Sequence, residues 1–378
     1  MQIAAIRAHL LRDLRTMLIV EVETECGITG LGEAGLTSRE GAVAGMISDL
    51  SDLLIGEDAT RIEHHWQRLW RSGFHPSGQV LSAAIAAIDI ALWDIRGKAL
   101  GVPVFDLFGG RCRDRILTYC HLRESGPEPL LAEARARVAE GWKALRWEPR
   151  FDAAAGVMRP APALEQAVAE FRLLRAELGP DIALLYDVHT RLTPPEAAWL
   201  CNAVADCRPA FIEDPLRVEL PAAYATLRAQ TPVPIAAGEQ LGPLWQWTEL
   251  LQNRLIDFAR IDLCIAGGLS QGKKIAAMAE ANLIDVVVHN PIGPVSTAAC
   301  LHLNMAIPNA ALHELPRRPG EMLAGLIETD ARWEDGYLIP GDGPGLGLTF
   351  HPERLGDYPF TPEHLPMLTR PDGGVTNW

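Results

Sequence analysis

The sequence predicts an α/β protein, a modified (β/α)8 barrel of the TIM type with an α+β capping domain. From about residue 116, eight short apolar runs alternate with helical patterns, and eight parallel strands are the number that closes such a barrel. Before that point, β-rich segments punctuated by glycine are followed by helical segments. We therefore expect a cap over residues 1–115, completed by part of residues 331–378, and a barrel over residues 116–330.

The composition of the 378-residue chain is that of a globular protein, with 48% hydrophobic and 22% charged residues. Its net charge of −14 repels nucleic acid and anionic lipid, so we expect neither as a partner. No run of about 18 uncharged apolar residues suggests a membrane span. The seven cysteines form no CxxC pair, which favours neither a zinc ribbon nor a disulfide framework and fits a reducing cytoplasm.

The N-terminal region predicts a β meander and then helices. Residues 3–11 and 17–24 are β-rich, residues 38–70 have helical character, and residues 81–100 are apolar almost all round, as in a buried helix.

The barrel strands are predicted from apolar runs bounded by turn residues. A loop insertion is expected after the second run, where the chain reads FDAAAGVMRPAPA. The eight runs are Leu117–His121, Ala144–Glu148, Ile182–His189, Pro209–Asp214, Pro234–Glu239, Ile256–Asp262, Ile284–Asn290 and Ala310–Leu315.

A polar or ionisable residue lies at or next to the C-terminal end of every run. Six of the seven intervals between these residues are 23 to 27 residues long, close to one strand–helix unit of roughly 30 residues. Because active sites of such barrels lie at the carboxyl ends of the strands, these side chains should converge. In order they are His121, Arg146, Asp187, Glu213, Glu239, Asp262, His289 and Glu314.

Three consecutive strand ends carry carboxylates, Asp187, Glu213 and Glu239. Converging carboxylates repel one another unless a cation neutralises them, and hard oxygen ligands suit Mg²⁺. Asp187 and His189 are two residues apart, so on a strand both would point to the same face, beside the metal. His289 would face the metal from the opposite side, with Asp262 hydrogen-bonded to its ring. Two such histidines make an acid–base pair.

Two other interpretations remain open. GLSQG at residues 268–272 matches the G-x-S-x-G nucleophile elbow, which would make Ser270 the nucleophile of a hydrolase. The alternative is a structural role, in which Gly267 and Gly268 make a turn and Ser270 caps the helix that follows. A barrel retained without catalytic activity is the other possibility, although the intact set of site residues argues against it.

These motifs resemble the enolase superfamily, mandelate racemase subgroup, and most closely acid-sugar dehydratases of the D-galactonate dehydratase type. The resemblance covers nearly the whole chain. It is carried by the segments ALWDIRGKALGVPVFDLFGG, YDVHTR, FIEDP, AAGE, IDLCIAGG, VVHNPIGPVSTAACLH and the terminal DGGVTNW.

The resemblance implies a cytoplasmic, homo-oligomeric, Mg²⁺-dependent dehydratase that converts an aldonic acid into its 2-keto-3-deoxy product. Asp187, Glu213 and Glu239 would hold Mg²⁺, His289 with Asp262 would be the base, and His189 the acid. Glu314 would hydrogen-bond the substrate carboxylate, as a donor only if it is protonated. Substrate contacts would come from His121, Arg146, Arg191, Arg15, His75 and Trp378. The loops near residues 12–18 and 71–80, which carry Arg15, Phe74 and His75, would shape specificity.

Differences between this sequence and the family motifs leave several sugar acids as candidate substrates. Relatives that racemise or cycloisomerise carry K-x-K on the second strand, where this chain has Arg146, Trp147 and Glu148, so a lysine base is not expected. Mannonate dehydratases use a tyrosine on a long loop that has no counterpart in residues 149–163. Gluconate, mannonate, arabinonate, fuconate or an aldarate are therefore alternatives to galactonate. The sequence assigns no role to Glu148.

Overall fold

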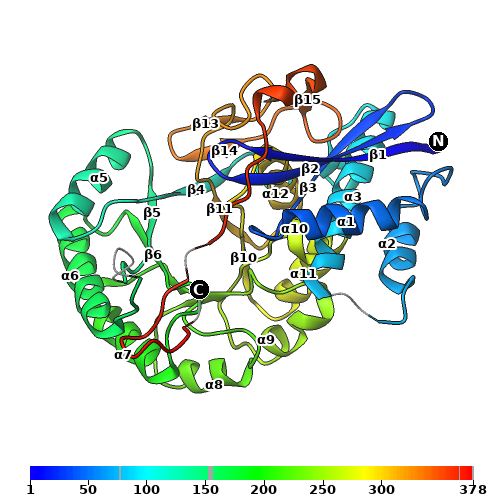
Figure 1. The fold of residues 1–378 in the computed structure, drawn as a ribbon. Helices are drawn as coiled ribbons and strands as arrows, with labels where there is room; N and C mark the ends of the chain where they lie inside the picture. The colour runs from blue at the N-terminus through cyan, green and yellow to red at the C-terminus, as the bar shows by residue number, and fades with distance from the viewer. Residues whose placement is uncertain (76–77, 152–155, 366, 377–378) are drawn as a thin grey trace.

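The structure, a computed structural model, describes residues 1–75, 78–151, 156–365 and 367–376 and contains the predicted closed barrel (Figure 1). Eight parallel strands pair in chain order, and the last pairs with the first. Each of the eight predicted runs overlaps one strand of the barrel. The strands are β4 (Ile116–His121), β5 (Ala144–Trp147), β6 (Ala183–Asp187), β7 (Phe211–Glu213), β8 (Ile235–Ala237), β9 (Phe258–Ala259), β10 (Asp285–Val288) and β11 (Ala310–Glu314).

Helices surround the barrel and cover the outer face of its strands (Figure 1). The barrel is modified after β11, where the described chain forms no α-helix and instead adds short antiparallel strands, one of which pairs with β4. The helices are α5 (Pro127–Ala139), α6 (Pro160–Leu178), α7 (Pro194–Val204), α8 (Ala222–Arg228), α9 (Thr248–Gln252), α10 (Leu263–Ala266), α11 (Gly268–Ala281) and α12 (Pro294–Ala306); the late strands are β12 (Ile327–Thr329), β13 (Arg332–Glu334), β14 (Tyr337–Ile339) and β15 (Leu348–Phe350).

The N-terminal region forms a three-stranded antiparallel sheet followed by helices, as predicted. Its core lies between the sheet and α3, where Val20 and Val22 pack with alanine and isoleucine side chains of that helix. Within the described residues, α3 alone has the length and hydropathy of a membrane span, and 78% of its apolar window is buried inside the protein. The elements are β1 (Ile3–Arg12), β2 (Thr16–Thr24), β3 (Thr29–Ala34), α1 (Glu40–Ser51), α2 (Ile62–Arg71), α3 (Gly78–Leu100) and α4 (Val104–Leu107).

Buried carboxylates of the N-terminal region hold the first turns of two barrel helices. Glu33 on β3 accepts a hydrogen bond from the backbone N–H of Ser296 on α12 at 2.8 Å. Asp89 on α3 accepts one from the backbone N–H of Ser270 on α11 at 3.0 Å. Both satisfy N–H groups that a helix start leaves without a partner. Because α11 and α12 follow β9 and β10, these contacts brace the strand ends that precede Asp262 and His289.

The cap proposed for Ser270 is wrong, because Asp89 takes that place and the Ser270 hydroxyl instead accepts a hydrogen bond from the Trp93 indole at 2.9 Å. Ser270 is buried, with 7% of its surface exposed. No histidine among the described residues hydrogen-bonds to its Oγ. A hydrolase nucleophile needs a base within hydrogen-bond reach. Ser270 is therefore a structural residue and not a nucleophile.

The burial of Glu33 at the start of α12 is expected to make the stability of the protein depend on pH. Burial raises the pKa of Glu33 to about 8, whereas an unfolded glutamate titrates near about 4.3. Between these values the folded state binds a proton that the unfolded state has released, so this group lowers the free energy of unfolding as the pH rises. Glu33→Gln should flatten that decline. Urea unfolding of both proteins from about pH 5 to about pH 8 measures it, and parallel pH profiles would contradict it.

Candidate active site

Six of the eight predicted strand-end residues line a cavity of about 900 Å³ at the carboxyl ends of the barrel strands, and Asp187 and Glu213 are buried next to Glu239. The loop between β1 and β2 closes one side of it through Arg15. Most of the residues predicted from the sequence line this cavity, namely Arg15, His121, Arg146, His189, Arg191, Glu239, Asp262, His289 and Glu314.

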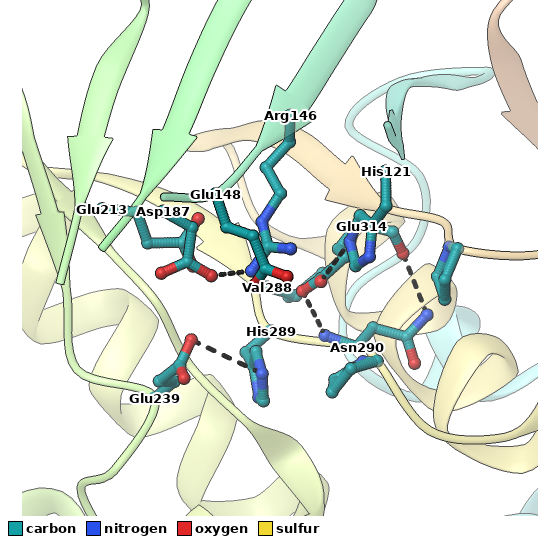
Figure 2. Close-up of polar contacts among 12 residues, drawn as sticks. His121, Arg146, Glu148, Asp187, Glu213, Glu239, Val288, His289, Asn290 and Glu314 are labelled. Atoms are coloured by element: carbon teal, nitrogen blue, oxygen red, sulfur yellow. Dashed lines mark hydrogen bonds and ion pairs between the residues drawn. The ribbon is translucent and has the colours of Figure 1, made fainter. Parts of the chain in front are cut away.

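Asp187, Glu213 and Glu239 come together at this end of the barrel (Figure 2). Asp187 and Glu213 are the last residues of β6 and β7, and Glu239 lies two residues beyond β8. Each offers a carboxylate oxygen within 4.8 Å of the others. Glu213 is fully buried, and its Oε2 has no hydrogen-bond or ion-pair partner among the described residues. An orphaned buried oxygen beside two further carboxylates fits a divalent cation.

Two arginines accompany these carboxylates. Arg260 pairs with Glu213 and reaches Glu239, and Arg146 pairs with Asp187. Burial raises the pKa of Glu213, with the charge of Glu239 adding to the rise against the opposing effect of Arg260. Burial also acts to raise the pKa of Glu239, but the nearby histidines and Arg260 outweigh it and lower the value. The site is therefore rich in negative charge and partly neutralised.

His289 lies directly after β10, and Asp262 holds its ring on the Nδ1 side. Its Nδ1 is 2.7 Å from Asp262 Oδ2. Its Nε2 is 3.4 Å from Glu239 Oε2 (Figure 2). Burial acts to lower the pKa of His289, but Glu239 and the hydrogen bond to Asp262 outweigh it, and the pKa is raised. A carboxylate at Nδ1 orients the ring and leaves Nε2 as the reactive nitrogen facing the cavity.

His189 reaches the site by a route that differs from the prediction. Strand β6 ends at Asp187, and His189 lies beyond it in a turn with φ +52°, a left-handed conformation uncommon for a non-glycine residue. The backbone N–H of His189 donates to Asp187 Oδ1 at 2.9 Å, which stabilises the turn. The ring Nε2 lies 2.9 Å from Asp187 Oδ2 and 3.0 Å from Arg146 Nη2. The histidine is beside the triad, but strand alternation does not place it there.

Glu314, the last residue of β11, is an acceptor in this structure. It receives hydrogen bonds from His121 Nε2 at 2.7 Å, from the Asn290 backbone N–H at 2.8 Å and from Arg260 at 2.7 Å. Arg260 and His121 outweigh the effect of burial and hold the pKa of Glu314 well below its usual range. Burial, together with Arg146, lowers the pKa of His121 to about 4, so this ring is a neutral donor. The protonated Glu314 that a donor role requires is therefore not favoured without substrate.

Arg260 is a site residue that the sequence analysis missed. It is fully buried and lies between Glu213 and Glu314, with Nη1 also donating to the Val288 carbonyl at 2.7 Å. One signal was available: an arginine two residues before Asp262, inside an apolar run, must point to the same side as Asp262. A charge in that position requires buried carboxylate partners.

The predicted substrate contacts divide into three groups. Arg15 and Arg191 line the cavity, and Arg15 Nη1 donates to the Pro291 carbonyl at 2.8 Å, linking the N-terminal loop to the segment after His289. His75 does not line the cavity in this structure; it is exposed, and the centre of its ring lies 5.0 Å from that of Phe74. Trp378 lies outside the described residues.

Comparison with known proteins agrees with this architecture. Residues 8–109 match the mandelate racemase / muconate lactonizing enzyme N-terminal domain, and residues 129–354 match the enolase C-terminal domain-like family. A D-galactonate dehydratase of Ralstonia nicotianae is 36% identical, with 96% of both chains covered. A D-mannonate dehydratase of a Sphingomonas species is 34% identical over the same shares.

A solved enolase from Pantoea ananatis, with bound D-gluconate and Mg, superposes with a TM-score of 0.93 at 30% identity over the full length of both chains. The two family matches together span both regions of the chain. The relatives are more than 30% identical over nearly all of it. The chain belongs to the enolase superfamily, in its mandelate racemase and muconate lactonizing enzyme group.

Proposed function

We propose that this protein is a Mg²⁺-dependent sugar acid dehydratase that acts on an aldonic acid of the galactonate type and yields the 2-keto-3-deoxy acid. The observation that carries the proposal is the placement of two histidines, His189 and His289, on either side of a three-carboxylate cluster in one cavity. Relatives named galactonate and mannonate dehydratases and a gluconate-bound neighbour support it.

In this proposal His289 is the base. Its Nε2 takes the C2 proton of the substrate, while Asp262 at Nδ1 holds the ring and stabilises the imidazolium that forms. The α-proton of a carboxylate is very weakly acidic, so the developing enediolate needs stabilisation. Mg²⁺ held by Asp187, Glu213 and Glu239 would supply a Lewis acid for the carboxylate and the 2-hydroxyl.

His189 is the acid. It donates a proton to the 3-hydroxyl, which leaves as water, and the resulting enol becomes the 2-keto product by taking a proton at C3. Because the two histidines lie on opposite sides of the carboxylate cluster, the proton and the hydroxyl should leave from opposite faces. A syn elimination, with one histidine performing both steps, is the alternative and would leave the other dispensable.

Cationic and neutral donors around the cavity complete the substrate site. Arg146 is buried and its Nε has no hydrogen-bond partner among the described residues, which suits a carboxylate or hydroxyl of the substrate. His121 and Glu314 occupy the wall between β4 and β11, and Arg15 and Arg191 lie at the rim, where they would contact the sugar chain.

One observation favours diacids as a second candidate substrate class. Arg15 and Arg123 both line the cavity and form no ion pair with a carboxylate of the described residues. Each pKa is lowered, chiefly by burial, and the charges of Arg317 and Arg15 lower that of Arg123 further. An aldarate would bring a second carboxylate to these cations.

A substrate panel tests the proposed function. Aldonic and aldaric acids, including galactonate, gluconate, mannonate, arabinonate and fuconate, are incubated with the Mg²⁺-loaded protein, and 2-keto product is measured with semicarbazide. We expect turnover of at least one acid that carries both a 2-hydroxyl and a 3-hydroxyl. If no sugar acid reacts and an ester or amide does, the dehydratase assignment is wrong.

The cytoplasmic location and the homo-oligomeric state stay predictions that follow from the family. Gel filtration with light scattering measures the second directly. A monomer under assay conditions would contradict it.

A further inference from the structure

Glu148, whose role was unclear from the sequence, makes two specific contacts at the cavity wall. It directly follows β5, and its Oε2 lies 3.1 Å from His189 Nδ1. Its Oε1 accepts a hydrogen bond from Arg150 Nη1 at 2.9 Å, and Arg150 Nη2 donates to the Arg123 carbonyl at 2.7 Å. The carboxylate is thus fixed on one oxygen and faces the histidine ring with the other.

The two histidines of the cavity are held in the same way. His289 has Asp262 at Nδ1 at 2.7 Å, and its Nε2 faces Glu239 of the carboxylate cluster. His189 has Glu148 at Nδ1 at 3.1 Å, and its Nε2 faces Asp187 of the same cluster. In each case the carboxylate at Nδ1 lies outside the metal-binding triad.

We propose that Glu148 is a positioning residue for His189, so that the protein contains two carboxylate–histidine pairs facing each other across the metal site. A carboxylate accepts hydrogen bonds only, so an oxygen 3.1 Å from Nδ1 of His189 favours a proton on that nitrogen. A ring flipped by 180° would present carbon to Glu148 and lose this bond. Glu148 therefore fixes the ring orientation and directs Nε2 to the reaction, a role like that of carboxylates behind catalytic histidines elsewhere. The catalytic part of this inference rests on the proposed function of His189 as the acid.

The hydrogen bond at Nε2 agrees with this tautomer, and Asp187 Oδ2, which lies 2.9 Å from Nε2, forms no hydrogen bond with it. Arg146 Nη2 lies 3.0 Å from His189 Nε2, and a guanidinium has donors only. In the resting state a neutral ring that receives this hydrogen bond carries its proton on Nδ1, facing Glu148, and it takes a second proton on Nε2 before it acts as the acid. The charge of Glu148 is maintained in turn: burial acts to raise its pKa, but the hydrogen bond from His189 and the charges of His189 and Arg146 outweigh it, and the pKa is lowered.

The first test needs no substrate. Protein labelled with ¹⁵N-histidine and loaded with Mg²⁺ is studied by NMR at about pH 8, above the ordinary range of imidazole titration, and the His189 signal is assigned with His189→Asn. We expect the Nδ1-protonated tautomer in the wild type and a shift towards the Nε2-protonated form in Glu148→Ala. An unchanged tautomer in Glu148→Ala would overturn the proposal.

The second test uses turnover. Glu148→Gln keeps the size of the side chain and removes its charge, and it should lower kcat by about 10–100-fold with KM changed by less than about 3-fold. Glu148→Asp, which keeps the carboxylate, should recover part of the loss. Glu177→Gln removes an exposed carboxylate that pairs with Arg135 far from the cavity and should leave kcat unchanged.

Two outcomes separate this proposal from its alternatives. If Glu148 served only to hold Arg150, Arg150→Gln would lower kcat as much as Glu148→Gln, and the proposal would fail. If the wild type dehydrates no sugar acid, the proposed function fails, while the tautomer measurement still decides whether Glu148 positions His189.

Discussion

Removing divalent cations with a chelator is expected to abolish turnover of the sugar acid, and adding Mg²⁺ is expected to restore it. The reason is that Asp187, Glu213 and Glu239 place carboxylate oxygens within 4.8 Å of one another. Their negative charges repel one another unless a cation binds between them. The α-proton also cannot be removed at a useful rate without stabilisation of the enediolate. Full turnover in excess chelator would contradict the metal assignment.

Metal binding can be measured apart from activity. Mg²⁺ at 100 times its Kd should stabilise the folded state by about 2.7 kcal/mol, visible as a higher Tm. Glu213→Gln should lose this rise in Tm, because Glu213 supplies the orphaned buried oxygen of the cluster. Glu177→Gln is the matched control, since it removes an exposed carboxylate and should keep the rise.

His289→Asn and His189→Asn should fail at different steps of the reaction. General acid–base groups contribute about 10²–10⁴-fold each, so both variants should lose dehydration by at least the lower figure. Without His289, the C2 proton should not exchange with D₂O. Without His189, elimination should fail, while exchange persists if enediolate formation is reversible.

The control for these variants is His64→Asn, which alters an exposed histidine outside the cavity. It should retain wild-type dehydration and exchange. If only one of the two cavity histidines proves necessary, the elimination is syn and that residue performs both steps. Normal dehydration by both variants would reject the assignment of roles.

The barrel and most of its site could be predicted from the sequence because both follow from local patterns. A (β/α) repeat of about 26 residues brings each strand end to the same rim, so Asp187, Glu213 and Glu239 had to converge once the strands were recognised. The pairing of His289 with Asp262 followed from their positions on neighbouring strand ends.

The parts that escaped prediction depend on contacts between distant segments or on turn geometry. Asp89 holds the start of α11 across 181 residues, which displaced the local expectation for Ser270. His189 lies in a left-handed turn, which strand alternation cannot describe. The ionised state of Glu314 depends on Arg260, which directly follows β9, and no sequence pattern states which buried charges will meet.

Proton NMR of the dehydration reaction in D₂O tests the central claim most directly. A sugar acid that the Mg²⁺-loaded protein turns over should lose its C2 proton signal and give a 3-deoxy product with one deuterium at C3, because the enol takes that hydrogen from solvent. The same mixture with His289→Asn should show neither change. A product without deuterium at C3, or loss of the C2 proton at the wild-type rate in His289→Asn, would contradict the account.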